Sequence, residues 1–168
     1  AEASSADGKS SPGGEDGVFT IAYAPNESTA ESADARNGLA EDLSQLLGCA
    51  VEEIQASDYN AIIEALRTGS ADMAYMGSQA LALGVERTDL EPIVMKAEEG
   101  DPEKAIYHSV LITSSSNTEI NSIADIKGKT MAFVDPDSTS GNLVPTAEII
   151  QAFPDDNLNT DMLHTNGD

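Results

Sequence analysis

The sequence predicts an α/β protein with a largely parallel sheet. Short apolar runs of strand length alternate with segments whose apolar residues recur at helical spacing. Capping residues stand before these helical segments, and Gly48 and Gly69 end two of them. Such an alternation indicates βα units that share one sheet. Ligands of these sheets bind at the carboxyl ends of the strands, here the loops at residues 23–28, 55–59 and 75–78.

Residues 18–104 form the predicted first lobe. Ser28 or Thr29 is the expected cap of its first helix, whose leucines share one apolar stripe (Leu39, Leu43, Leu46 and Leu47). Ser57 or Asp58 caps the second helix, whose apolar residues again recur at helical spacing. The expected strands are residues 18–23, 50–55, 72–76 and 90–97, and a third helix is expected at residues 79–86.

Residues 105–168 form a predicted second lobe that is incomplete, and a polar turn at residues 98–104 separates it from the first. About two strands and one or two helices are expected here, fewer strands than an independently stable sheet normally has. The expected elements are a β-type segment at 105–113, a short capped helix with Ile120, Ile123 and Ile126, a strand from Met131, and a helix at 146–153.

The charge of the chain excludes two classes of partner. Its 168 residues carry 8 Lys plus Arg against 30 Asp plus Glu, a formal net charge of −22. Nucleic acids and anionic membrane surfaces would both be repelled. An anionic ligand would have to be held by hydrogen bonds at short range. Residues 1–17 are rich in acidic residues, Ser and Gly and contain no large apolar residue. This composition predicts a flexible N-terminal tether.

Residues 131–145 form the candidate functional site. An apolar strand leads into a polar turn, and a helix follows. The start of a helix offers free backbone N–H groups and the positive end of the helix dipole, which together hold anions. Ser138, Thr139 and Ser140 add hydroxyl donors at the same point. Together with Gly141 they predict an oxyanion site, named here the 138–141 turn, that uses neither metal nor cofactor.

Two tyrosines stand where a phenol can reach a cleft. Tyr59 begins a helix and Tyr107 heads the long β-type segment, although half-buried packing remains an equal alternative for each. Tyr75 lies within a strand and is expected in the core. His108 is expected to point to the opposite face of the strand from Tyr107 and to have a structural role. His164 lies in a polar tail that is expected to fray.

The same residues allow other interpretations. Asp135, Asp137 and Thr139 fit the D-x-D-x-T pattern of aspartate-nucleophile phosphatases. In those enzymes the first carboxylate attacks phosphorus, the second is a general acid and Mg²⁺ neutralises charge. That chemistry also needs a downstream lysine, and no Lys or Arg follows Lys129. A capped helix that binds no ligand is the structural alternative.

Five stretches occur in the order of a known family. They are residues 23–26 (YAPN), 57–67 (SDYNAIIEALR), 71–77 (ADMAYMG), 107–112 (YHSVLI) and 135–145 (DPDSTSGNLVP). Together they resemble the phosphate/phosphite/phosphonate-binding proteins of ABC transporters, from about Val18 to at least Pro145. The resemblance implies the type II periplasmic-binding-protein fold, with two α/β lobes that close around a ligand.

The resemblance also implies a function. Members of the family are not enzymes; they are extracytoplasmic, periplasmic or lipid-anchored at the cell surface, and deliver a small phosphorus oxyanion to a membrane permease. By this resemblance Ser138, Thr139 and Ser140 grip the ligand oxygens, and Tyr59 and Tyr107 donate hydrogen bonds from the other side. Asp135 and Asp137 are hypothesised to read the ligand's protonation state, because a carboxylate accepts hydrogen bonds only from a protonated ligand oxygen.

Two departures from the family pattern lead to a further expectation. Family chains run further and complete the second lobe, which supplies a ligand histidine and the carboxylates that read an amine. The anchoring cysteine of the family is also absent, since the one cysteine, Cys49, is internal. We therefore expect a C-terminally truncated chain that lacks the N-terminal lipid anchor.

Overall fold

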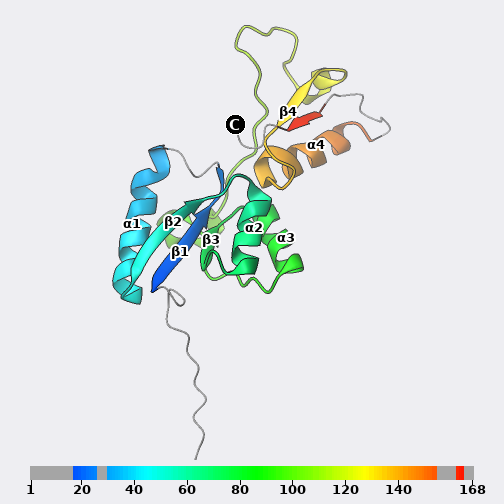
Figure 1. Cartoon of the computed structure of the whole chain (residues 1–168). Helices are drawn as coiled ribbons and strands as arrows, with labels where there is room; N and C mark the ends of the chain where they lie inside the picture. Colours follow the sequence, from blue (N-terminus) through cyan, green and yellow to red (C-terminus); the bar gives the residue numbers. More distant parts are fainter. Residues whose placement is uncertain (1–16, 26–29, 155–161, 165–168) are drawn as a thin grey trace, which may run out of the picture.

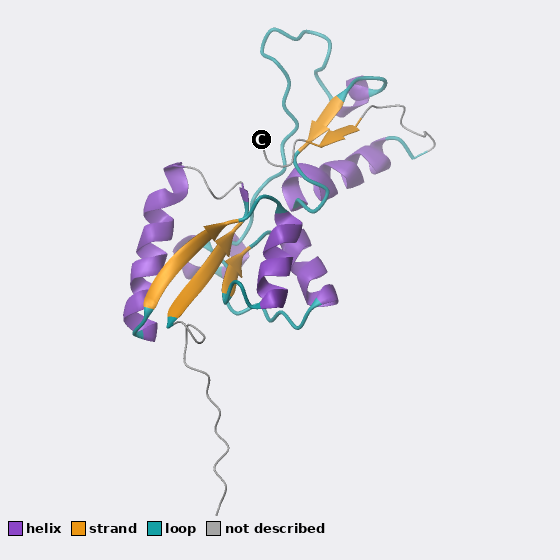
Figure 2. Ribbon diagram, in the orientation of Figure 1, coloured by secondary structure: helices purple, strands orange, loops and turns teal. Residues whose placement is uncertain are grey.

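The computed structural model describes residues 17–25, 30–154 and 162–164. Within them the chain forms two α/β parts, each with its own sheet (Figures 1 and 2). The expected tether, up to residue 16, and the expected helix cap at Ser28 or Thr29 lie outside the described residues. None of the helices that the structure describes is both long and apolar enough to span a membrane.

The first sheet is parallel and has the strand order β2-β1-β3. β1 (Val18–Tyr23) and β2 (Ala50–Gln55) have the predicted bounds, and β3 (Met73–Tyr75) is shorter than expected. β1 is central because it pairs on both sides, and its Ile21 and Ala22 are fully buried. The carboxyl ends of the three strands therefore meet at one edge of the sheet.

Three helices flank this sheet. α1 (Ala30–Leu47) lies along β2, while α2 (Tyr59–Thr68) and α3 (Ser78–Arg87) lie on the side of β3 (Figure 1). The leucine stripe expected for α1 is wrong in part, because the side chain of Leu46 is 81% exposed and that of Leu39 is 39% exposed. β2 is an edge strand, so the sheet beside α1 offers too little apolar surface to bury all four leucines of the stripe.

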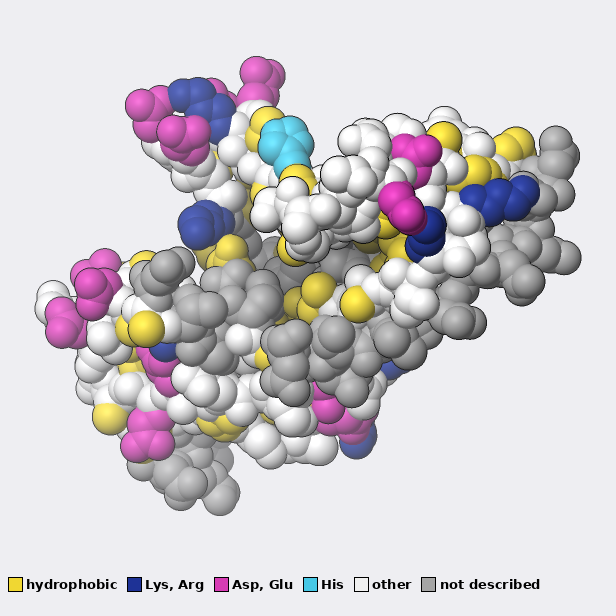
Figure 3. Space-filling model, turned by 90° about the horizontal axis from the view of Figure 1, so that it is seen from above, with side chains coloured by type: hydrophobic (Ala, Val, Ile, Leu, Met, Phe, Trp, Pro, Cys, Tyr) yellow, Lys and Arg dark blue, Asp and Glu magenta, His cyan; other side chains and the backbone are white. Residues whose placement is uncertain are grey.

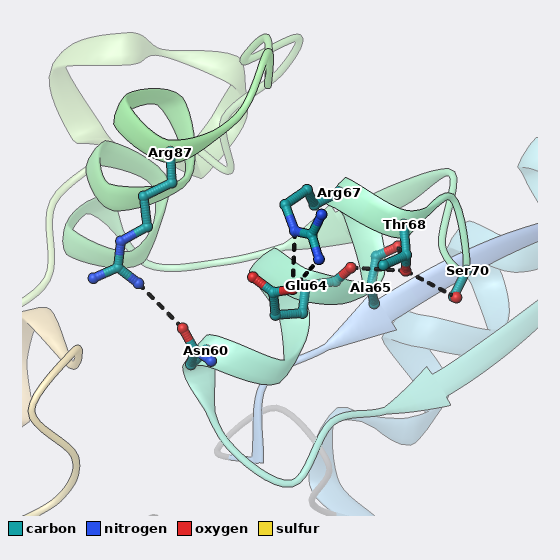
Figure 4. Close-up of polar contacts among 7 residues, drawn as sticks. All are labelled: Asn60, Glu64, Ala65, Arg67, Thr68, Ser70 and Arg87. Carbon is teal, nitrogen blue, oxygen red and sulfur yellow. Dashed lines mark hydrogen bonds and ion pairs between the residues drawn. The ribbon is translucent and has the colours of Figure 1, made fainter.

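α2 has the cap, the end and the buried face that its sequence predicts. Asp58 caps it by accepting a hydrogen bond from the Ala61 N–H at 2.8 Å. Gly69 ends it with φ of 74°, a left-handed conformation that favours glycine. Figure 4 shows how its polar side is tied, with Arg87 of α3 donating to Asn60 at 3.1 Å. The buried face carries Tyr59, Ile62 and Ile63.

Two predicted strands are wrong. Residues 90–97 and 105–113 are irregular in the structure, and two short 3-10 turns, η2 (Glu98–Gly100) and η3 (Pro102–Lys104), lie between them. A strand needs a neighbour for its backbone N–H and C=O groups, and no described strand pairs with either segment. Their apolar side chains are accordingly exposed: Ile93, Val94, Met95, Ile106, Val110, Leu111 and Ile112.

The second part is smaller. β4 (Met131–Phe133) pairs in parallel with β5 (Met162–His164), which was not predicted, so the expectation of a fraying tail is wrong at His164. The other elements are η4 (Ile123–Ile126), the π-helical turn η5 (Thr139–Leu143) and α4 (Val144–Ala152). Ile126, Phe133 and Ile149 form its core. The lobe boundary between residues 104 and 105 stays a prediction.

Candidate functional site

The turn after β4 is shaped by Ser138. Its Oγ accepts a hydrogen bond from the Gly141 N–H at 3.1 Å, and its own N–H donates to the Asp135 carbonyl at 3.0 Å. Ser138 is 5% exposed. It therefore caps the helical turn η5 from within the fold, as Ser does before many helices. A Cβ added to Gly141 would lie 2.5 Å from Val134 Cγ2, so only glycine fits there.

Two backbone N–H groups of the 138–141 turn make no hydrogen bond to the described part of the chain. The N–H groups of Asn142 and Leu143 donate to the Ser138 carbonyl at 3.1 and 3.0 Å. For the N–H groups of Thr139 and Ser140, by contrast, the described residues provide no hydrogen-bond acceptor. These two groups belong to the first two residues of η5, where the dipole of the helical segment favours a negative charge.

The Thr139 hydroxyl is oriented by the first part of the molecule. Its Oγ1 accepts a hydrogen bond from the backbone N–H of Gln79, in the first turn of α3, at 2.9 Å. Because this bond uses the oxygen as an acceptor, the hydroxyl proton remains to be donated elsewhere. Ser109 donates to the Ser140 carbonyl at 2.6 Å and ties the 105–113 segment to the same turn.

Tyr107 joins this group, but Tyr59 does not. A Cβ placed on Gly77 would lie 3.2 Å from Thr139 Oγ1 and 4.0 Å from the Tyr107 hydroxyl, so both hydroxyls approach the start of α3. Tyr107 is 58% exposed. Tyr59 is 5% exposed and packs in the core of the first part, at the N-terminal end of α2. Tyr75, expected in the core, is only partly buried and stacks against Tyr23 with ring centroids 6.4 Å apart.

A cleft of about 640 Å³ borders the 138–141 turn. Tyr107, Ser109, Thr139 and Ser140 line it beside the acidic Glu148 and the apolar residues 111, 123, 144 and 145. His108 lines the same cleft as Tyr107, so the two residues do not lie on opposite faces of a strand, and the structural role expected for His108 stays a prediction. The alternation of a strand does not apply, because this segment is not a strand.

A second cleft, of about 530 Å³, is acidic. Its lining includes Asp58, Asp135 and Asp137. Each of the first two carboxylates has a structural partner: Asp58 accepts from Ala61 N–H, and Asp135 accepts from Asp137 N–H at 2.7 Å. Among the described residues no group of three or more His, Cys, Asp or Glu side chains has a metal-binding arrangement. Asp135 and Asp137 thus lie beside a different cleft from Thr139.

The surface repeats the acidic character of the sequence. In the view of Figure 3, acidic side chains lie mostly around the outline of the face, and hydrophobic side chains gather toward its middle. A net charge of −22 opposes the approach of any anion over long distances. An anion in this cleft would therefore need neutral hydrogen-bond donors at short range, and Tyr107 and Thr139 carry hydroxyl groups there.

Sequence reasoning missed two contributors to this site. Gln79 and Ser109 both contact the turn. Gln79 lies outside the five family-like stretches, and Ser109, within residues 107–112, was not singled out as a site residue. The loop at residues 75–78 was expected to border a ligand, because it follows a parallel strand. The loop predicted in this way ends at Ser78, so it does not include Gln79. Gln79 and Thr139 come together only because α3 packs against η5.

Solved structures share this fold. The binding protein component of an ABC phosphonate transporter from Pseudomonas aeruginosa matches with a TM-score of 0.70 and 24% identity, over 89% of this chain and 50% of that one. PhnD1 from Prochlorococcus marinus, solved in complex with methylphosphonate, matches with a TM-score of 0.64 and 17% identity, over 89% and 56%. The protein therefore has the α/β fold of periplasmic binding proteins, as the sequence predicts.

Two proteins of known name are similar to this chain in sequence. The chain is 35% identical over 137 residues to the phosphate-import protein PhnD of Mycolicibacterium smegmatis, covering 80% of this chain and 42% of that protein. It is 34% identical over 110 residues to the phosphonates-binding periplasmic protein of Escherichia coli, covering 62% and 31%. The chain thus spans less than half the length of these two relatives.

The family follows from a match over most of the chain. The model of the periplasmic substrate-binding proteins of phosphonate ABC transporters matches residues 21–163, and the chain belongs to this family. The resemblance drawn from the five sequence stretches is confirmed. The family is not one of enzymes, so the alternative of an aspartate-nucleophile phosphatase has no support from it. The ligand roles of residues 138–141, Tyr59 and Tyr107 stay predictions.

Proposed function

We propose that this chain is the solute-binding component of an ABC transporter, and that it binds phosphate, phosphite or a phosphonate outside the cytoplasm without catalysis. Family membership supports the transport role. Two relatives carry names that refer to phosphate import and to phosphonate binding, and a structural neighbour was solved with methylphosphonate. A membrane permease is the partner that such a role requires, and an N-terminal lipid is the proposed anchor.

One observation supports the proposal most directly. The hydroxyl proton of Thr139 and the N–H groups of Thr139 and Ser140 are all left for a ligand, beside a cleft that Tyr107 also lines. These are neutral donors, which match an anion's need for hydrogen bonds without metal or positive side chains. Ser138 and Gly141 hold this arrangement in shape. Tyr59, buried at the first position of α2, would contribute from the first lobe only if a bound ligand reaches the start of that helix.

Calorimetric titration with phosphate, phosphite, methylphosphonate and sulfate tests the proposal. Thr139→Val removes one donor to a charged ligand and keeps the size of the side chain. We expect it to weaken binding of the preferred phosphorus anion about 10- to 100-fold, since a hydrogen bond to a charged group contributes about 1.5–3 kcal/mol. Thr113→Val is the matched control, because Thr113 is exposed and outside the cleft.

Two outcomes would contradict the proposal. One is a wild-type protein that binds none of the three phosphorus anions more tightly than sulfate. The other is turnover of a chromogenic phosphate ester with Mg²⁺ that Asp135→Asn abolishes, which would restore the enzyme alternative. Equal affinity of Thr139→Val and Thr113→Val would remove Thr139 from the ligand residues and leave the transport role untouched.

A further inference from the structure

Gln79 makes two hydrogen bonds to the turn that bears the candidate site. Its backbone N–H donates to Thr139 Oγ1 at 2.9 Å, and its side-chain Nε2 donates to the Pro136 carbonyl at 2.8 Å. Gln79 belongs to α3 of the first part, so these bonds connect elements that are about 60 residues apart in sequence. A single residue thereby fixes both a hydroxyl and a carbonyl of the neighbouring turn.

We propose that Gln79 is a positioning residue for oxyanion binding, acting through Thr139 and Pro136; this inference rests on the proposed function. The N–H of Gln79 occupies one of the two lone pairs of the Thr139 oxygen, so the hydroxyl hydrogen points away from Gln79. A freely rotating threonine hydroxyl would offer either its proton or its lone pairs in any direction. Only the proton is useful to an anion, and the Gln79 bond restricts the directions in which that proton can point.

The side chain of Gln79 acts on a different atom. The Pro136 carbonyl belongs to the backbone that leads into the 138–141 turn, and Pro136 itself lines the acidic cleft rather than the cleft of Thr139. Gln79 Nε2 and Asn142 Nδ2 both donate to this oxygen, at 2.8 and 2.9 Å. A carbonyl oxygen has two lone pairs, so these two donors satisfy it. Without Gln79 the Pro136 carbonyl keeps only the bond from Asn142, so the backbone that leads into the 138–141 turn is held by one hydrogen bond fewer.

The other side-chain atom of Gln79 argues against a role in stability alone. Gln79 Oε1 is buried and has no hydrogen-bond partner among the described residues. Leaving a buried acceptor unpaired destabilises a folded protein. A leucine of similar size would avoid this cost and would lose only the bond to Pro136. Residues that oppose stability in this way are typical of functional sites.

A role in ligand binding and a role in stability predict different effects of Gln79→Leu, and the test measures both. Gln79→Leu in the 168-residue protein is titrated with methylphosphonate and with inorganic phosphate, and its thermal midpoint is measured without ligand. We expect affinity to fall about fivefold, the equivalent of one ordinary hydrogen bond, while the thermal midpoint stays equal to that of wild type or rises. Gln45→Leu, an exposed glutamine of α1, is the matched control and should bind like wild type.

A second measurement examines the bond to Thr139 without ligand. Amide hydrogen exchange at Gln79 should become faster in Thr139→Val and stay slow in Thr139→Ser, which keeps the hydroxyl. Unchanged exchange in Thr139→Val would overturn the orienting role of the Gln79 N–H. Thr88→Val at the C-cap of the same helix serves as a control, because Thr88 donates to the Gly84 carbonyl rather than bonding to Gln79.

The binding results separate the two proposals. If wild type binds an anion and Gln79→Leu binds it equally well, the positioning role fails and the proposed function stands. Weaker binding accompanied by a matching loss of thermal stability also overturns the positioning role, since general loosening then explains it. If wild type binds neither anion, the proposed function fails, and the positioning role fails with it.

Discussion

Replacing Gly141 with alanine tests whether the 138–141 turn depends on a close approach to the strand before it. The added Cβ would lie 2.5 Å from Val134 Cγ2, 2.6 Å from Val134 Cβ and 2.9 Å from Ser138 Oγ. Carbon atoms that are not bonded prefer separations of about 3.5–4.0 Å. A new rotamer of Val134 moves its Cγ2 but not its Cβ, so the backbone itself must shift.

The expected cost follows from these distances. Overpacking by one methyl group in a tight site typically costs about 1–3 kcal/mol. A backbone shift also strains two hydrogen bonds, from Val134 N–H to the Gly141 carbonyl at 3.2 Å and from Gly141 N–H to Ser138 Oγ at 3.1 Å. Each contributes about 1 kcal/mol when fully formed. Gly141→Ala should therefore lower the free energy of unfolding by about 2–4 kcal/mol.

Gly38→Ala is the matched control. Gly38 lies within α1, and a Cβ built there would meet no atom within 4 Å. Alanine is the better helix former, so this change should raise the free energy of unfolding by about 0.5–1 kcal/mol. Urea unfolding followed by circular dichroism measures both variants, with the m-value checked for each. A loss below about 0.5 kcal/mol for Gly141→Ala would refute the reasoning, because the turn would then have room for a side chain.

Three further predictions concern the fold and its ionisation. Ile63→Ala should destabilise the protein by about 2–5 kcal/mol in urea unfolding, since Ile63 is fully buried, whereas Val85→Ala on α3, with Val85 48% exposed, should cost much less; equal costs would contradict this. Asp58→Ala should cost about 0.5–2 kcal/mol by removing the α2 cap, and Asp58→Asn should retain most of it; a similar loss in both would show that the charge rather than the cap matters. The hydrogen bond and charge of Arg67 hold the pKa of Glu64 below its ordinary value of 4.5. Because the folded pKa is lowered, the pair stabilises the fold above the unfolded pKa, and this contribution is lost as pH falls through the lowered value. In an NMR titration Arg67→Met should move the pKa of Glu64 upward, and an unmoved pKa would rule out the pairing.

The parts of the fold that sequence predicted are those with local signals. β1 and β2 have the expected bounds, and α2 begins after Asp58, one of the two expected caps, and ends at the expected Gly69. In α2 the periodicity, the cap and the glycine all lie within a dozen residues of one another. The error at the start of α4 is also local: Pro145 was assigned to the turn, yet proline fits the first turn of a helix, where its missing N–H costs nothing.

The wrong predictions concern segments whose structure depends on a neighbouring segment of the chain. Residues 90–97 and 105–113 have apolar, strand-like sequences, but pairing is a property of two segments, and one segment cannot reveal it. β5 is three residues long and was missed for the converse reason, since pairing with β4 defines it despite its weak pattern. The candidate site divides in the same way. The 138–141 turn has a local signature, whereas Gln79 approaches Thr139 only through tertiary packing.

The two irregular segments also affect how a solution of this 168-residue protein responds to ionic strength. Val94 is 85% exposed and Ile112 is 90% exposed, in stretches that lack a neighbouring strand. In dilute buffer the net charge of −22 keeps copies apart by mutual repulsion. In 1 M salt the screening length falls to about 3 Å, so this repulsion vanishes while apolar attraction persists. Self-association through cross-strand pairing is then favoured, and concentrated stocks keep best at low ionic strength.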